Sequence, residues 1–246
     1  MIEVDFLRVI ERESHALRAT IAAGPDRPIA FYPSWTILDL VAHTGGVHRW
    51  VAGMVRRGAR RPPARPPHVD RDPARLAEWF DDGVAMVVDA LRRSRPDRPV
   101  WTMATDQTAG FWRRRMAHET AAHRWDAEHA IGVPRPIDPG VAATGIAETL
   151  EIHVVRPLAG ARVCGRGERV KLRPLDMPGA WVVTLHPDRV HVDAADGPAD
   201  VTISGSASSV WLNLMGRRVA DVETTGDEPT LARFRDALGL ADPPSH

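Results

Sequence analysis

The chain has one cysteine, Cys164, among 246 residues, so no disulfide can form within it and a reducing cytoplasm is its expected setting. Net charge is also absent, because 32 basic side chains balance 32 acidic ones. This balance excludes a protein that binds nucleic acid or membrane surfaces through overall charge. Lys171 is the only lysine, and the resulting arginine bias is typical of high-GC bacterial genomes and indicates no function.

Long apolar runs are missing as well. The first ten residues include Glu3 and Asp5, where a secretory signal would be basic and then apolar. No later stretch approaches the roughly 18 uninterrupted apolar residues of a membrane helix. We therefore expect a soluble cytoplasmic protein with no nucleic-acid or membrane partner, either a monomer or a weak homodimer. Its hydrophobic content of 43% is enough for a buried core in one large or two small domains.

The first 157 residues have the pattern of helices separated by proline-rich joints, with apolar residues near a 3.6-residue period. Thr36 and Asp39 have the spacing of a capping box, and Asp72-Pro73 is typical of a helix start. Short connections between such helices favour antiparallel packing as a bundle. The expected helices are residues 3–22, 36–58, 73–95, 110–131 and 139–155.

After Pro157 the pattern changes to short, valine-rich segments separated by Pro, Gly and Asp, as in strands and turns. The expected strands are residues 168–175, 180–186, 189–195, 200–204 and 221–225, and the expected helices are 206–214 and 229–238. The sequence thus predicts an α+β protein, with a helical domain at residues 1–157 and a smaller α+β domain at residues 158–246.

A carboxylate and an imidazole share one face of the fourth expected helix. Glu119 and His123 are four residues apart, and the same face carries Trp112, Met116 and Ala130. This face therefore points toward the bundle interior. A buried carboxylate and imidazole need a partner, and a divalent metal ion is an economical one.

The second expected helix supplies a third donor, His43, on its apolar stripe. One histidine from one helix and Glu-xxx-His from another leave a coordination position open, as in catalytic zinc sites. Asp39, one turn before His43, and Asp126, three residues after His123, are candidate acceptors that orient the two imidazoles. The candidate metal ligands, and through the metal the candidate catalytic residues, are His43, Glu119 and His123.

The alternative that the pair binds no metal stays open at this point, because Glu and His four residues apart also occur by chance on solvated helix faces. His48 lies about 140° round its helix from His43 and is a poorer ligand. His118 is rotated about 100° from Glu119, so we expect it at the surface or behind the ligands rather than among them.

Two helix segments carry a resemblance to a known family. Residues 35–50, with the sequence WTILDLVAHTGGVHRW, and residues 118–126, HETAAHRWD, resemble the mycothiol-dependent maleylpyruvate isomerase family, within the wider group of DinB-like metal-binding bundles. Segments of the second half, at residues 180–181, 200–206, 214–218 and 226–227, are similar to the C-terminal domain of that family. The resemblance implies a DinB-like four-helix bundle followed by a sterol-carrier-like α+β domain.

In that family the metal ligands fall on the positions of His43, Glu119 and His123, the same residues that the spacing selects. The resemblance implies zinc or another divalent metal that receives the thiol of mycothiol, the small thiol of actinobacteria, as a metal-bound thiolate. Its partner is then a small electrophile. Addition to a conjugated double bond and later expulsion makes an isomerase, whereas displacement of a leaving group or opening of a ring makes an S-transferase.

Several further residues are weaker candidates. Arg217 is a weak candidate for binding a polar part of the thiol, although cations are also favoured at helix C-termini. Arg49, Trp112 and Arg113 lie near the proposed ligands in sequence, but surface arginines and a core tryptophan are the plainer interpretation. Core packing is likewise the plainer role for Trp35 and Trp125.

Two other functions remain open from the sequence. One is a hydrolase that uses a metal-bound water in the same site. The other is a non-catalytic, anti-sigma-like regulatory module with structural zinc, which would need a fourth protein ligand. Cys164, the obvious fourth donor, lies outside the helical domain.

Overall fold

The structure is a computed structural model that describes residues 4–62, 71–155 and 165–238. The chain divides into two compact units, Met1–Ile137 and Asp138–His246. We describe each by itself. No helix in the described ranges combines the length and the apolar character needed to cross a membrane.

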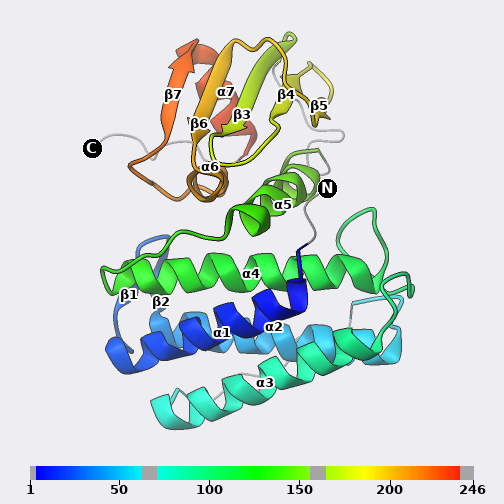
Figure 1. Cartoon of the computed structure of the whole chain (residues 1–246), viewed down its shortest axis with the longest axis vertical. Coiled ribbons are helices and arrows are strands. Elements are labelled where there is room, and N and C mark those ends of the chain that lie inside the picture. The colour runs from blue at the N-terminus through cyan, green and yellow to red at the C-terminus, as the bar shows by residue number, and fades with distance from the viewer. Residues whose placement is uncertain (1–3, 63–70, 156–164, 239–246) are drawn as a thin grey trace. The chain divides into compact units, whose positions relative to one another are not determined.

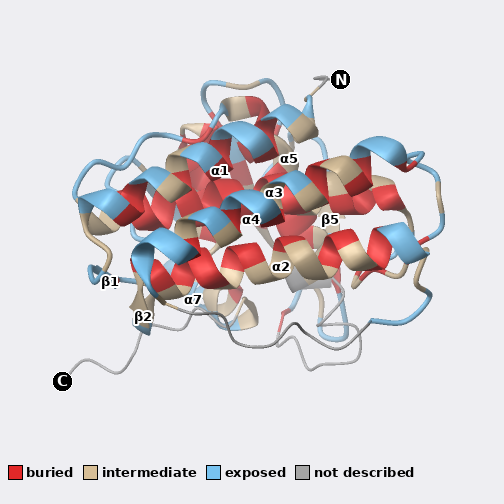
Figure 2. Cartoon of the chain, turned by 90° about the horizontal axis from the view of Figure 1, so that it is seen from below, coloured by how far each residue is buried: buried red, intermediate tan, exposed pale blue. Residues whose placement is uncertain are grey.

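The N-terminal unit is a bundle of four helices (Figure 1), as the sequence predicts. Exposed and buried residues lie on opposite sides of the outer helices (Figure 2), which is the outcome of their 3.6-residue apolar period. The four helices are α1 (Phe6–Ala23), α2 (Ile37–Arg57), α3 (Pro73–Arg93) and α4 (Ala109–Ala130).

Local sequence signals fix where these helices begin. The backbone N–H of Asp39 donates to Thr36 Oγ1, and the backbone N–H of Thr36 donates to the Asp39 carboxylate at 3.0 Å, which completes the predicted capping box of α2. Asp72 caps α3 ahead of Pro73. Gly45 allows α2 to approach α3 closely, because a Cβ atom there would lie 2.5 Å from the Trp79 ring.

Helix α4 is the most deeply buried helix of the bundle and contacts α1, α2 and α3. Residues 120–128 are all buried, although they include charged groups. One of them, Arg124, pairs with two buried carboxylates, because its Nε donates to Glu13 on α1 at 2.7 Å and its Nη1 donates to Glu128 at 2.8 Å. The buried side of α4 is therefore held by ion pairs as well as apolar packing.

A short hairpin precedes α2, where the sequence analysis predicted no strands. It consists of β1 (Pro28–Ile29) and β2 (Tyr32–Thr36), which pair antiparallel with an irregular register. The first turn of α2 follows β2 directly. The hairpin therefore places aromatic residues beside the start of that helix.

The C-terminal unit has a five-stranded mixed sheet of order β5-β4-β3-β6-β7, in which β3 and β6 run parallel and the other pairs are antiparallel. Helices α6 (Ala207–Leu214) and α7 (Glu228–Ala237) pack on the central strands β3 and β6. This architecture confirms the expected α+β class. The strands are β3 (Glu168–Pro174), β4 (Trp181–Leu185), β5 (Val190–Asp193), β6 (Val201–Gly205) and β7 (Glu223–Gly226).

The fifth helix, α5 (Pro139–Thr149), continues as the π-helical turn η1 (Leu150–Val155) and belongs to the C-terminal unit. The division of the chain thus falls between Ile137 and Asp138, earlier than the boundary near residue 157 that the change of pattern indicated. The reason is packing, because Gly145 lies against the Trp211 ring and Trp211 Nε1 donates to Thr149 Oγ1 at 3.0 Å.

Candidate metal centre

Three side chains from two helices converge in the N-terminal unit. His43 Nε2 on α2 lies 3.2 Å from Glu119 Oε1 on α4, and His123 Nε2 lies 3.3 Å from the same oxygen. One donor atom from each residue lies within 4.8 Å of the other two. Two nitrogens and one carboxylate oxygen at this spacing fit the first shell of a divalent metal ion.

The convergence follows from helix geometry. Glu119 and His123 are one helical turn apart on α4, so their side chains lie one above the other. His43 is one turn after Asp39 at the start of α2, where the capping box fixes the entry of the helix. The rings of His43 and His123 are nearly perpendicular, with centroids 5.4 Å apart, and Nε2 of each ring faces Glu119 Oε1.

Glu119 is held in its charged form. Burial raises the pKa of this carboxyl, but the nearby guanidinium of Arg115 and the hydrogen bonds of the two histidines outweigh burial and hold the pKa well below its usual range. Arg115 lies one turn before Glu119 and pairs with Oε2, the oxygen that the histidines do not contact. The sequence analysis missed Arg115, although its spacing of four from Glu119 was the available signal.

Asp126 orients His123, as predicted. Its Oδ2 lies 3.3 Å from His123 Nδ1, and its side chain is fully buried. Burial lowers the pKa of His123, but hydrogen bonds to Asp126 and Glu119 outweigh burial and raise it to about 9. The metal-free protein therefore holds a proton between two carboxylates at neutral pH.

The matching expectation for Asp39 is wrong. Its carboxylate accepts from the backbone and hydroxyl of Thr36 and from Arg71 Nε at 3.1 Å, and no contact with His43 is among its described interactions. The capping hydrogen bonds direct this side chain toward the N-terminus of α2. A carboxylate used in this way is turned away from the imidazole one turn later.

Two aromatic rings of the β1–β2 hairpin lie against the ligand histidines. The Trp35 ring lies 4.9 Å from the His43 ring, and the Tyr32 ring meets the His123 ring edge-on at 5.9 Å. Tyr32 and Trp35 also stack on each other at 4.9 Å. Trp35 packs against the hydrophobic core, as expected, and it also borders the candidate site. The sequence analysis gave Tyr32 no role.

The sequence of the bundle matches a described family. Residues 7–128 match the profile of the mycothiol maleylpyruvate isomerase N-terminal domain. The N-terminal domain belongs to this family. All three converging residues lie within the matched segment of this maleylpyruvate isomerase N-terminal domain.

Solved structures extend the likeness beyond this domain. Crystal structures of the mycothiol-dependent maleylpyruvate isomerase and of a His-to-Ala mutant of it each cover 92% of this chain and 94% of their own, with a TM-score of 0.58 and 17% identity. At that identity the likeness shows the fold. A UbiJ-SCP2 ubiquinone synthesis protein covers 45% of this chain and 99% of its own at 24% identity, with a TM-score of only 0.30. No curated protein matches the sequence.

Two other histidines of the isomerase-family domain lie outside the converging group. His48 is fully buried and its Nε2 lies 3.0 Å from Thr120 Oγ1, and burial lowers the pKa of this imidazole to about 4. His118 is buried against Phe6, with ring centroids 5.9 Å apart, rather than at the surface. Neither belongs to the His43 cluster.

Three residues near the ligands in sequence have structural partners in the isomerase-family domain. Arg49 stacks on the Trp79 ring and donates to the backbone oxygen of that residue. Arg113 donates to the backbone oxygens at the end of α3, and buried Trp112 donates to Trp101 O at 2.7 Å. Trp112 is thus in the core, as expected, whereas both arginines are half-buried with structural partners rather than at the surface.

Arg217 lies in the C-terminal unit, following α6. It is buried, and its Nη1 donates to Met215 O at 3.0 Å. Its role in holding the thiol stays a prediction. Cys164 lies outside the described residues.

Proposed function

We propose that this protein is a divalent-metal-dependent enzyme that activates mycothiol for attack on a small electrophile, as an S-transferase or as a thiol-assisted cis-trans isomerase. The observation that carries the proposal is the convergence of His43, Glu119 and His123 from two helices. Within the described residues no fourth His, Cys, Asp or Glu joins this cluster. Three protein ligands with one position left over are typical of catalytic rather than structural zinc.

The residues present fit a divalent metal. Their donor atoms are His43 Nε2, His123 Nε2 and Glu119 Oε1, and the carboxylate is already ionised because its pKa is held low. A bound zinc ion or another divalent metal would supply a positive charge that lowers the pKa of a thiol at the remaining position.

The surrounding side chains prepare the donors. Asp126 accepts a hydrogen bond from His123 Nδ1, which leaves Nε2 of that ring facing the site. Arg115 binds Glu119 Oε2, so that Oε1 is the oxygen left facing the two histidines. Trp35 packs against the His43 imidazole and Tyr32 against that of His123.

The two reactions differ in the fate of the carbon–sulfur bond. In the isomerase, the thiolate adds to a conjugated cis double bond, and the electron pair of that bond moves into the adjoining carbonyl. Rotation about the resulting single bond and expulsion of the thiolate give the trans isomer and return mycothiol. In the transferase, the sulfur displaces a leaving group or opens a ring, and mycothiol stays in the product.

The test compares metal content and thiol binding in the parent and in Glu119→Ala, with Glu78→Ala on the exposed face of α3 as the matched control. We expect about one metal ion per chain in the parent and control and little in Glu119→Ala. Mycothiol should bind the parent in calorimetry, and a chelator should abolish that binding. Metal retained by Glu119→Ala, or thiol binding that ignores the chelator, would overturn the proposal.

The same samples separate the alternative functions. A hydrolase that uses metal-bound water would hold the metal without binding the thiol. A structural zinc module would lose much of its thermal stability on chelation, and His43→Ala would unfold the bundle. The enzyme that we propose stays folded in both experiments.

A further inference from the structure

The two helices that carry the candidate metal ligands are joined by a second polar contact. His48 of α2 is fully buried, and its Nε2 lies 3.0 Å from Oγ1 of Thr120 on α4, which is also fully buried. His48 lies five residues after His43, and Thr120 directly follows Glu119. The contact therefore ties α2 to α4 close to the point where the candidate ligands meet.

The direction of this hydrogen bond follows from the partners of the hydroxyl. Thr120 Oγ1 has one hydrogen and donates it to the backbone oxygen of Met116 at 2.7 Å. The same oxygen is then an acceptor toward His48, whose Nε2 must carry the hydrogen. Burial lowers the pKa of His48 to about 4, so the ring is neutral at pH 7 and its Nδ1 is an acceptor. In the described structure this buried Nδ1 has no hydrogen-bond partner.

A histidine buried in this way is expensive for the fold. A buried acceptor without a partner costs more free energy than a typical hydrogen bond between neutral groups contributes. The His48 ring also packs against Phe80 of α3, with ring centroids 5.8 Å apart, and a leucine could fill the same space without an unsatisfied atom. Stability alone therefore does not account for the hydrogen bond between α2 and α4.

Metal binding would remove the direct hydrogen bond between His43 and Glu119. The atoms that contact each other, His43 Nε2 and Glu119 Oε1, are also the atoms that would bind the metal. An imidazole nitrogen that binds a metal carries no hydrogen, so it can no longer donate to the carboxylate. The hydrogen bond between His48 and Thr120 uses none of the ligand atoms and can persist in both states.

We infer that His48 and Thr120 are positioning residues of the metal centre. Their hydrogen bond holds α2 against α4 at the spacing that brings the ligands of the two helices to one metal ion. The inference rests on the proposed function, because it requires a metal at this site.

The first experiment measures the Zn²⁺ affinity of the full-length, metal-stripped protein by competition with a chromophoric chelator. Thr120→Val keeps the shape of the side chain but removes the acceptor, and it should weaken zinc binding about tenfold or more, as is typical for residues that orient metal ligands. Thr120→Ser keeps the hydroxyl and should restore most of the affinity. Equal affinity of Thr120→Val and the parent would overturn the inference alone, whereas a parent that binds no zinc would overturn the proposed function as well.

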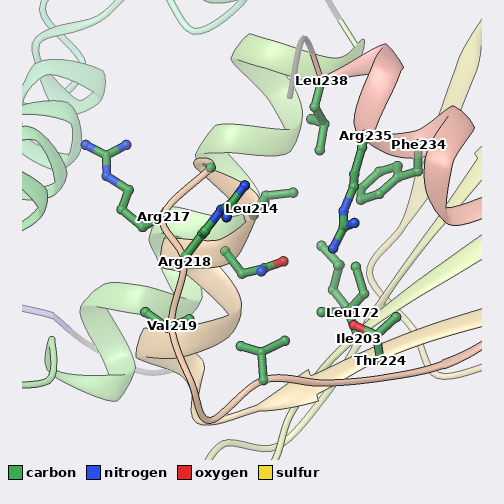
Figure 3. A pocket seen from close by; sticks show the side chains of 13 residues that line it. Leu172, Ile203, Leu214, Arg217, Arg218, Val219, Thr224, Phe234, Arg235 and Leu238 are labelled. Carbon is green, nitrogen blue, oxygen red and sulfur yellow. The ribbon is translucent and has the colours of Figure 1, made fainter. Parts of the chain in front are cut away.

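The matched control is Thr44→Val. Thr44 directly follows His43, as Thr120 follows Glu119, and its buried hydroxyl donates to a backbone oxygen one turn earlier in its own helix at 2.9 Å. A second control, Thr224→Val, makes the same change on β7, where Thr224 lines the cavity of the C-terminal unit that Figure 3 shows. Zinc affinity should be unchanged in both controls. A loss in Thr44→Val equal to that in Thr120→Val would overturn the inference, because zinc binding would then respond to any buried hydroxyl beside a ligand.

A double variant separates positioning from stability. Thr120→Val alone leaves the buried Nε2–H of His48 without its acceptor, so it should also lower the stability of the metal-free protein in urea titrations. His48→Leu combined with Thr120→Val replaces both partners by apolar groups and should restore most of that stability. The zinc affinity of the double variant should nevertheless stay about tenfold or more below that of the parent. Recovery of zinc affinity together with stability would overturn the inference, because the hydrogen bond would then matter only for folding.

Discussion

Metal binding to His123 should release a proton, because the metal-free protein holds this imidazole between Glu119 and Asp126 with a pKa of about 9. A metal ion at Nε2 requires the neutral ring. At pH 7.5 the loss of the His123 proton should therefore contribute about one proton per Zn²⁺ bound, and at pH 9 about half a proton, in addition to the proton that a zinc-bound water loses near pH 7. The contribution of His123 to the apparent affinity should rise about tenfold per pH unit up to pH 9 and then level off.

The assay is calorimetric titration of Zn²⁺ into chelator-stripped protein, in buffers that differ in ionisation enthalpy, from pH 6.5 to 10. The slope of the observed heat against the buffer enthalpy gives the number of protons released. Asp126→Asn removes one of the groups that raise the pKa of His123, so proton release at pH 8 should fall below that of the parent. Asp188→Asn, in an exposed turn, is the matched control.

The same pKa sets the pH dependence of stability in the metal-free protein. A histidine whose pKa rises from 6.5 to about 9 on folding stabilises the fold fully below pH 6.5, and this contribution is lost as the pH rises through 9. The difference corresponds to at most about 3 kcal/mol.

The calorimetric titration also gives the result that would refute this pKa. If Zn²⁺ binds at pH 7.5 with a heat that does not change with the buffer, no proton is released, and His123 is already neutral in the metal-free protein.

Three further predictions concern stability. Arg124→Ala should lower the free energy of unfolding by about 3–5 kcal/mol in urea titrations, because it leaves buried carboxylates without their ion-pair partner. The control Arg93→Ala, at the surface, should lower it by less than about 1 kcal/mol. Equal effects of the two variants would contradict a stabilising role of the buried ion pairs. Gly145→Ala should destabilise the chain by about 1–3 kcal/mol because its methyl group meets the Trp211 ring, and an unchanged melting temperature would count against that packing. His48 is kept neutral by burial with a pKa of about 4, so stability should fall by up to about 3 kcal/mol between pH 6.5 and 4, and the fall should be smaller in His48→Gln.

Local signals in the sequence predicted most of the helices and strands, because helix caps and the periodic spacing of apolar residues involve only a few neighbouring residues. The Thr36 box and Asp72-Pro73 start the helices where they were expected to. The candidate ligands could also be chosen, because a one-turn spacing puts Glu119 and His123 together wherever α4 lies. The sequence alone could not show that α2 brings His43 to the same point, because this depends on how the helices pack in the bundle.

The features that the sequence did not predict depend on contacts between residues far apart in the chain, or on two possible hydrogen-bond partners that compete for one side chain. Asp39 has the right spacing to orient His43, but the cap of its own helix uses the carboxylate. Tyr32 borders the site only because a hairpin too short to show an alternating pattern folds back before α2. Helix α5 has an apolar pattern that suits either domain, and only its contact with Trp211 assigns it.

Because α5 packs within the C-terminal unit, it determines where the chain can be divided into two fragments. A break between Ile137 and Asp138 leaves each fragment with the neighbours that form its own core. A break near residue 157 would instead carry α5 away from Trp211 and leave an apolar helix exposed on one fragment and an uncovered tryptophan on the other. A fragment of the C-terminal unit intended to fold by itself should therefore begin at Asp138, with α5 as its first element.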